Sequence, residues 1–169
     1  ASVLVLDRGV IPMGASTRNA GFACIGSVGE LLADLKIDVE ENLRARIKAR
    51  FEGLQLLRSV LGDDFIEYDD CGGWEIFTEQ EKFEEAVNVV PKFNAWMSQL
   101  IGVDECYKTG EFEGYPAIFN RAEGALHSGK MMKRLIELNR LAGVEIRWQS
   151  EVNLLDPNLG VVKTGQGLN

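Results

Sequence analysis

The first 22 residues place the tightest constraint on what this chain can fold into. Residues 3–6 are four consecutive apolar side chains, Val-Leu-Val-Leu, and the run closes on a single carboxylate, Asp7. A run that is apolar on both faces is typical of a strand buried between helix layers in a parallel sheet. A loop rich in small residues, GASTRNAGF, follows at residues 14–22. We therefore predict a buried parallel strand that brings an acid and a glycine-bearing loop to one edge of a sheet.

Asp7 has two interpretations. In dinucleotide-binding sheets, an acid at the carboxyl end of a strand accepts hydrogen bonds from the adenosine ribose, about 20 residues after a G-x-G-x-x-G turn. That turn does not occur in this chain. An isolated acid at the end of a strand is otherwise a solvated surface charge, but the adjoining glycine-bearing loop favours the ribose role.

The segments VLVLDRG and GASTRNAGF together resemble the D-amino-acid-oxidase-type superfamily of FAD-dependent oxidoreductases, and most closely its γ-glutamylputrescine oxidase-like amine oxidases. In that family a similar G-A-S-x-R-N-x-G segment wraps the flavin. Residues 124–152, GALHSGKMMKRLIELNRLAGVEIRWQSEV, resemble a second family element and depart from it at Ser128, where proline is common. The resemblance implies FAD as cofactor. It also implies that the chain is an internal fragment of a longer protein, without the strand that carries G-x-G-x-x-G.

The resemblance and the residue chemistry assign eight cofactor-binding residues, in two segments of the chain. They are Asp7, Arg8, Ala15, Ser16, Arg18, Asn19, Gly21 and Val152. Glycine and small side chains permit close backbone approach to a phosphate or a ring. We expect Arg18 to neutralise pyrophosphate charge, and Asn19 to hydrogen-bond the flavin side of the ligand. The alternative for this loop is an ordinary solvated surface turn.

Val152 is assigned through the resemblance alone, because in the family the backbone of the matching valine hydrogen-bonds the adenine. The residue chemistry by itself indicates an apolar core position. His127 is the only histidine, and its ordinary pKa of about 6.5 suits a catalytic base. Its place just before a predicted helix fits packing or loop hydrogen bonding equally well, so no catalytic residue and no metal site are assigned.

Composition excludes several classes of function. The chain has 46% hydrophobic and 26% charged residues, as an ordinary globular protein does. A net charge of -8 without a cluster of Lys and Arg argues against nucleic-acid binding. Three widely spaced cysteines indicate neither a disulfide framework nor a zinc site. No apolar run approaches the roughly 20 residues of a membrane span, and we expect a cytoplasmic location.

The remaining pattern predicts a mixed architecture. Helices are expected at residues 38–62, at residues 78–102 with an interruption at Pro91, and from an N-cap at Ser128 to Gly143. Two aromatic and β-branched runs around Gly-Gly predict an antiparallel hairpin at residues 65–78. Further strands are expected at residues 103–107, 115–120, 144–148, 151–155 and 161–163, with a loop at 108–114.

These elements predict an α/β fold with an α+β insertion. Residues 1–33 and 121–169 would form a partial, Rossmann-like FAD-binding domain around a parallel sheet, which holds the first strand and residues 144–148. Residues 34–120 would form an antiparallel-sheet substrate domain with covering helices. Because the parallel sheet would be incomplete, its edges favour self-association.

The sequence leaves two functions open, which belong to different classes of protein. By resemblance, the parent protein would oxidise the C–N bond of an amine or amino acid, with hydride passing to the flavin. Residues 1–169 alone are expected to be inactive and to bind FAD weakly, because they lack the phosphate turn. The alternative is a non-catalytic globular domain that binds a protein partner through its antiparallel sheet.

Overall fold

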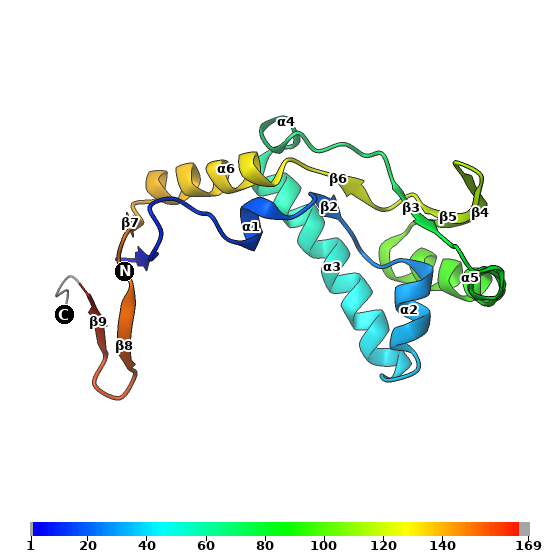
Figure 1. The fold of residues 1–169 in the computed structure, drawn as a ribbon, viewed down its shortest axis with the longest axis horizontal. Helices are drawn as coiled ribbons and strands as arrows, with labels where there is room; N and C mark the ends of the chain where they lie inside the picture. The colour runs from blue at the N-terminus through cyan, green and yellow to red at the C-terminus, as the bar shows by residue number, and fades with distance from the viewer. Residues whose placement is uncertain (1, 166–169) are drawn as a thin grey trace. The chain divides into compact units, whose positions relative to one another are not determined.

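A computed structural model describes residues 2–165, and the chain divides into two compact units (Figure 1). Residues 1–20 and 127–169 form the first, which we call the split unit. Residues 21–126 form the second, the continuous unit. One compact unit is thus inserted within the sequence of the other, and the predicted assignment of residues 34–120 as a substrate domain stays a prediction.

A parallel strand pair organises the split unit. Strand β1 (Leu4–Leu6) pairs with β7 (Glu145–Arg147), so the expected shared sheet of these two segments is confirmed. The chain reaches β7 through helix α6 (Ser128–Leu141), and the short helix α1 (Ala15–Arg18) lies against α6. Parallel strands require such a crossover, because a tight turn can only reverse the chain.

The last two strands of the split unit form a sheet of their own. Strand β8 (Val152–Asp156) pairs antiparallel with β9 (Val161–Thr164), with a bulge between Val152 and Leu154. The Asp156 carboxylate accepts the backbone N–H of Leu159 in the connecting turn. Both strands were predicted, and this local turn pairs them with each other in a sheet apart from that of β1 and β7.

An antiparallel three-stranded sheet lies at the centre of the continuous unit. Strand β5 (Tyr115–Asn120) runs between β3 (Gly73–Ile76) and β4 (Tyr107–Phe112). The two residues between β4 and β5, Glu113 and Gly114, have φ values of 50° and 84°. Two positive φ values are what a two-residue hairpin loop of type I′ needs, and its twist matches that of the flanking strands.

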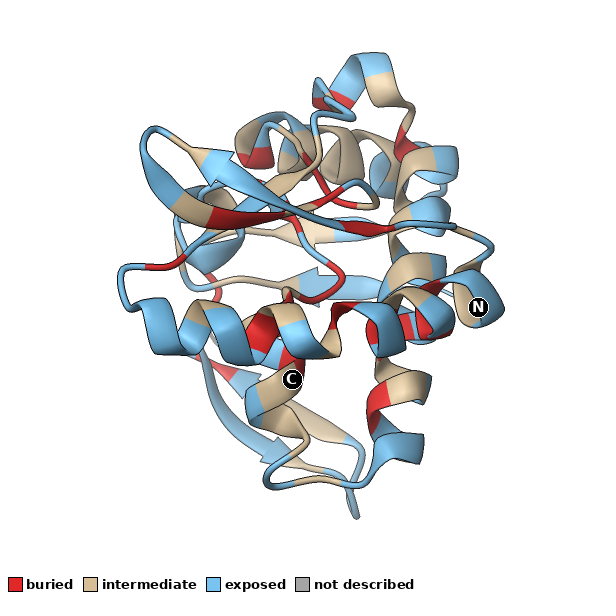
Figure 2. Cartoon of the chain, turned by 90° about the vertical axis from the view of Figure 1, so that its right-hand side faces the viewer, coloured by how far each residue is buried: buried red, intermediate tan, exposed pale blue. Residues whose placement is uncertain are grey.

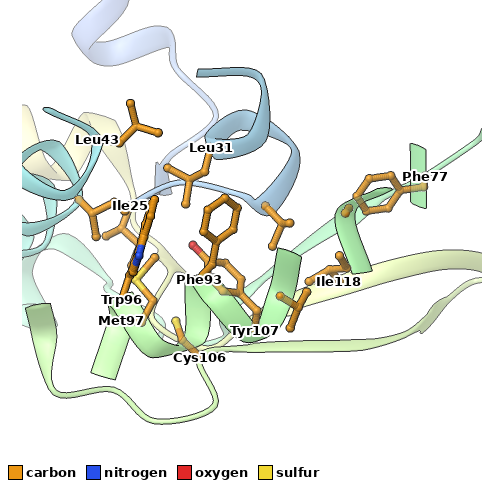
Figure 3. Packing of buried hydrophobic residues seen from close by; sticks show 14 residues of the cluster. Ile25, Leu31, Leu43, Phe77, Phe93, Trp96, Met97, Cys106, Tyr107 and Ile118 are labelled. Carbon is orange, nitrogen blue, oxygen red and sulfur yellow. The ribbon is translucent and has the colours of Figure 1, made fainter. Parts of the chain in front are cut away.

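Helices cover this sheet. Helix α5 (Gln80–Ile101) lies against β4, β5, α2 (Val28–Asp34) and α3 (Glu40–Leu61), which is followed by α4 (Asp63–Ile66). A two-stranded pairing of β2 (Phe22–Ala23) with β6 (Gly124–Ala125) joins the ends of the unit. The buried side chains between helices and sheet, several of which Figure 3 shows, include Ile25, Leu31, Leu43, Ile47, Phe93, Trp96, Met97, Tyr107 and Ile118.

All of the buried hydrophobic residues between residues 2 and 165 belong to the continuous unit, and Figure 2 marks buried positions in red. In the split unit, Leu4 and Val5 of β1 are 47% and 43% exposed. The prediction that the opening run is buried on both faces is therefore wrong for this part of the chain. Within the described residues β1 pairs with β7 alone, so its apolar side chains lack a second layer to pack against.

The predicted hairpin at residues 65–78 is also wrong. Its first half contains the end of α4, followed by Glu67 in the left-handed conformation. Asp63, which forms an ion pair with Arg58 at 2.7 Å, places a carboxylate in the first turn of that helix, where the helix dipole favours it. The second half, β3, pairs with β5, and Trp74 lies opposite Phe119, 45 residues further along the chain.

The two long helices are confirmed, but the elements around them differ in detail. The expected strand at residues 103–107 is a loop up to its last residue, and β4 instead fills most of the expected loop at residues 108–114. The N-caps of α3 and α5 are Val39 and Glu79, each one residue after the first residue of the helix range that the sequence predicts. His127, rather than Ser128, is the N-cap of α6.

No helix within residues 2–165 is long and apolar enough to cross a membrane.

Candidate functional site

The carboxyl end of β1 opens into a cavity of about 480 Å³ in the split unit. The loop after β1 and the helix α1 supply most of its walls, and α6 supplies one residue. Its lining residues are Asp7, Arg8, Gly9, Ile11, Pro12, Met13, Gly14, Ser16, Arg18 and Met132. Four of the eight predicted cofactor residues therefore line one cavity.

Asp7 is fixed at this edge by the parallel strand pair. Its backbone N–H donates to the Arg147 carbonyl at 3.0 Å, and its carbonyl accepts the Ser150 N–H at 2.8 Å. Its carboxylate Oδ1 accepts the Gly9 N–H at 2.6 Å. Within residues 2–165 the second oxygen, Oδ2, accepts no hydrogen bond. A carboxylate held by one oxygen and open at the other suits a ligand hydroxyl donor such as a ribose.

Two guanidinium groups face the same cavity. Arg8 and Arg18 both line it and are exposed. Neither forms an ion pair with an acid in the part of the chain that the structure describes. Unpaired Arg side chains suit phosphate oxygens, which the planar guanidinium group can bind through two parallel hydrogen bonds. The cavity thus combines one acceptor and two cationic groups, which fits the ribose and pyrophosphate of a dinucleotide.

Two further candidates are on α1 but outside the cavity lining. Ala15 opens the helix, and Asn19 ends it as the C-cap. The Asn19 side-chain amide donates to the carbonyls of Ala15 and Ser16 at 3.2 and 3.1 Å. These bonds hold the end of α1 in place, as the alternative of a local loop role predicts. The cofactor roles of Ala15 and Asn19 stay predictions.

Gly21 lies in the continuous unit, and its backbone explains why glycine is needed there. Its φ is 79°, and its carbonyl accepts the Leu126 N–H at 2.8 Å. A Cβ at this position would lie 2.1 Å from the Leu126 carbonyl oxygen, closer than real Cβ contacts allow. Gly21 therefore permits the close approach of β2 and β6. Its contact with the cofactor stays a prediction.

Val152 begins β8 and is 44% exposed, so it is not the core residue that its chemistry alone would indicate. It lies two residues after Ser150, whose N–H bonds to the Asp7 carbonyl. The Gln149 N–H likewise donates to the Gly9 carbonyl at 2.9 Å. The chain before β8 thus runs beside the loop after β1, which brings Val152 near the predicted ribose site.

His127 caps α6, because its Nδ1 accepts the Lys130 N–H at 3.3 Å. This contact is the loop hydrogen bonding that the sequence offers as the alternative to a catalytic base. Two cysteines of the continuous unit, Cys106 and Cys24, are not activated as nucleophiles. Burial raises the pKa of Cys106 to about 11, and partial burial of the thiol, followed by the nearby Glu123 carboxylate, raises the pKa of Cys24.

The continuous unit contains a second arrangement, which sequence reasoning missed. Glu123, 8% exposed, accepts the N–H groups of Ile25 and Gly26 through Oε1, at 3.0 and 3.1 Å. The buried Tyr107 hydroxyl donates to the Gly26 carbonyl at 2.7 Å, and so does the Asn120 amide at 3.2 Å. Three buried polar side chains thus fix the turn before α2 on the sheet.

A pH dependence of stability follows from Glu123. Burial, together with the neighbouring Glu30 and Glu75 carboxylates, raises the pKa of Glu123 above its ordinary value of 4.5. The stability from a group whose pKa is raised on folding is fully present below the unfolded pKa and is lost as the pH rises through the folded pKa. We expect the non-titrating variant Glu123→Gln to gain stability relative to the wild type as the pH rises from below 4.5 to neutrality. Urea unfolding of both proteins across this range measures the difference, and a constant difference would contradict the assignment.

A small parallel strand pair, together with separate antiparallel sheets, defines a mixed α/β protein. The sequence profile of the DAO family, described as FAD-dependent oxidoreductases, matches residues 1–168. The chain belongs to this family, and the family is FAD dependent. No curated protein matches the chain.

Solved structures share the fold over nearly the whole chain. Glycine oxidase from Bacillus cereus superposes with a TM-score of 0.62 at 19% identity, covering 98% of this chain and 46% of its own. L-amino acid deaminase from Proteus myxofaciens superposes with a TM-score of 0.67 at 15% identity, covering 98% of this chain and 37% of its own. Iminodiacetate oxidase from Chelativorans sp. BNC1 superposes with a TM-score of 0.66 at 12% identity, covering 99% of this chain and 46% of its own. The chain spans less than half the length of each of these proteins.

Proposed function

We propose that the complete protein binds FAD and oxidises the C–N bond of an amine or amino acid. Membership of the FAD-dependent oxidoreductase family supports the cofactor and the reaction type. The similar folds of glycine oxidase and L-amino acid deaminase support a small nitrogen-containing substrate. When bound, a flavin accepts hydride from the carbon next to nitrogen and is reoxidised by oxygen or another acceptor.

One observation carries the cofactor assignment: the open carboxylate of Asp7 and the unpaired Arg8 and Arg18 share one cavity at the end of β1. Asp7 Oδ2 would accept the ribose hydroxyls, and the two guanidinium groups would hold the pyrophosphate. Ser16 would add a hydroxyl donor from α1. These residues bind and orient the cofactor, and none of them is assigned a role in moving a proton or hydride.

The match along residues 1–168 does not favour the alternative of a non-catalytic domain that binds a protein partner. A direct experiment separates the two functions. The full-length protein is purified, its visible absorbance is recorded for bound flavin, and it is mixed without oxygen with glycine, L-phenylglycine and benzylamine in turn. We expect a bound flavin and loss of its visible absorbance with at least one of them. Absence of bound flavin, also after incubation with FAD, would overturn the proposal.

A cytoplasmic location and self-association are part of the same proposal. Three free cysteines, of which Cys24 and Cys71 are exposed, support a reducing compartment. The exposed apolar residues of β1, among them Leu4 and Val5, support association of copies through the parallel sheet. Sedimentation equilibrium of residues 1–169 tests association through the incomplete sheet, and a monomer at all concentrations would contradict it.

A further inference from the structure

A second cavity, of about 270 Å³, lies wholly within the continuous unit. Its walls are mainly apolar and come from three sheet strands, β2 and α2, and Figure 3 shows two of its residues, Tyr107 and Ile118, on β4 and β5. The Trp74 ring on β3 also lines it and packs on Phe119 with ring centroids 4.9 Å apart. The volume lies just below the roughly 300 Å³ at which typical ligand pockets begin, so it suits a small molecule.

Two carboxylates face this apolar cavity, and no cation of the described residues lines it. Among residues 2–165, Glu75 and Glu123 are the only ionisable side chains of its lining besides Cys24 and Tyr107, and no Lys, Arg or His belongs to that lining. Glu75 accepts the Ser27 hydroxyl at 2.9 Å and the Gly29 N–H at 2.9 Å, but it has no ion pair within residues 2–165. The pocket walls therefore carry negative charge without a compensating positive side chain.

The second oxygen of Glu123 is the most informative atom of this cavity. Glu123 is more than nine-tenths buried, and both of its hydrogen bonds go to Oε1. Its Oε2 accepts no hydrogen bond from the described residues. This oxygen lies beside Gly73, where an added Cβ would be 2.6 Å away, and both residues line the cavity. This oxygen of a largely buried acid therefore has room for a hydrogen-bond donor that a ligand in the cavity supplies.

We propose that this cavity binds the ammonium group of a small amine that carries no carboxylate next to its nitrogen. The inference rests on the proposed function and narrows its substrate class from amines or amino acids to amines. An ammonium group offers several donors and a positive charge to Glu123 Oε2, and the Trp74 face can attract the same charge. An apolar substituent of the amine would fill the space along Phe22, Val28 and Ile118.

The same charges disfavour an α-amino acid. Its carboxylate lies two bonds from the nitrogen, so an amino acid bound through its ammonium group would bring a third carboxylate near Glu75 and Glu123. Like charges close together in a mainly apolar cavity repel, and no cationic residue of the described lining offsets them. Arg50, which approaches the Ile25 carbonyl, is already paired with Glu30 at 2.8 Å. The cavity thus discriminates by charge, and not only by size.

Three probes that share a phenyl ring test the inference by calorimetric titration of the full-length protein. Benzylamine has the ammonium group, L-phenylglycine has the same group with an adjacent carboxylate, and phenylacetate has only the carboxylate. We expect benzylamine to bind at least about tenfold more tightly than phenylglycine, and phenylacetate not to bind. Phenylglycine that binds as tightly as benzylamine would overturn the inference.

The variant Glu123→Gln links the selectivity to the proposed residue. Its amide oxygen can still accept the Ile25 and Gly26 N–H groups, so the turn is kept while the charge is removed. We expect benzylamine affinity to fall at least about tenfold and the preference over phenylglycine to shrink. Glu111→Gln, an exposed acid of β4 outside the cavity lining, is the matched control and should bind like the wild type. Unchanged benzylamine affinity in a folded Glu123→Gln protein would refute the role of Glu123.

The flavin content of the same samples separates this inference from the proposed function. If phenylglycine, but not benzylamine, reduces the bound flavin, the amine inference is wrong while the oxidoreductase proposal stands. If the protein binds no flavin, the proposed function is wrong. The inference that amines are its substrates is then wrong as well. If benzylamine binds and reduces the flavin, and Glu123→Gln weakens both, both are supported.

Discussion

Replacing Gly21 with alanine is expected to lower the free energy of unfolding of the continuous unit by about 3 kcal/mol. A left-handed conformation costs a non-glycine residue about 1–2 kcal/mol, and forcing an atom into a packed site adds about 1–3 kcal/mol. Both terms apply, because Gly21 has a φ of 79° and its Cβ would lie 2.1 Å from the Leu126 carbonyl oxygen. The two backbones cannot separate freely, since the Leu126 N–H donates to the Gly21 carbonyl.

A second glycine supplies the control for this experiment. Gly53 lies inside α3, is exposed, and an added Cβ there meets nothing within 4 Å. Gly53→Ala should therefore raise the free energy of unfolding by about 1 kcal/mol, because alanine favours a helix interior. Urea unfolding in a Trp148→Phe background, followed by tryptophan fluorescence, reports on the continuous unit, which contains the two remaining tryptophans, Trp74 and Trp96. A Gly21→Ala protein as stable as the wild type would show that the backbone contact is loose.

Replacing Asp7 with alanine in the full-length protein is expected to lower its FAD affinity at least about tenfold. The open Oδ2 of Asp7 can accept ribose hydroxyl groups, and each hydrogen bond to a charged acceptor contributes about 1.5–3 kcal/mol. Glu145→Ala, which removes an exposed acid from the neighbouring strand β7, is the control and should keep the affinity. Calorimetric titration of the flavin-free protein with FAD measures both, and equal affinity of wild type and Asp7→Ala would identify Asp7 as a mere surface charge.

Much of the fold could be predicted because its signals are local in sequence. Apolar residues repeating every three or four positions predicted α3, and the structure buries three of them, Leu43, Ile47 and Leu61. The parallel pairing of β1 with β7 could also be expected, because a helix between two strands favours a crossover. The prediction of a hairpin at residues 65–78 was wrong, because aromatic and β-branched composition alone cannot reveal that β3 pairs with β5.

The candidate sites show the same limit. Asp7, Arg8, Ser16 and Arg18 could be predicted together, because one short segment of chain carries them all into one cavity. The role of Glu123 could not be predicted, because its partners Ile25 and Gly26 lie 98 and 97 residues away in the sequence. A single acid in a loop gives no periodic signal, and its role exists only after the sheet and the turn before α2 have come together.

We expect the cavity at the end of β1 to hold the adenosine diphosphate part of FAD, and ADP itself tests this expectation most directly. ADP has the ribose and pyrophosphate but no flavin ring, so it probes Asp7, Arg8 and Arg18 without the rest of the cofactor. The flavin-free, full-length protein is titrated with FAD in the absence and presence of ADP. We predict that ADP competes with FAD, and that Asp7→Ala and Arg18→Ala weaken this competition. Tight FAD binding that ADP leaves unchanged would contradict the claim.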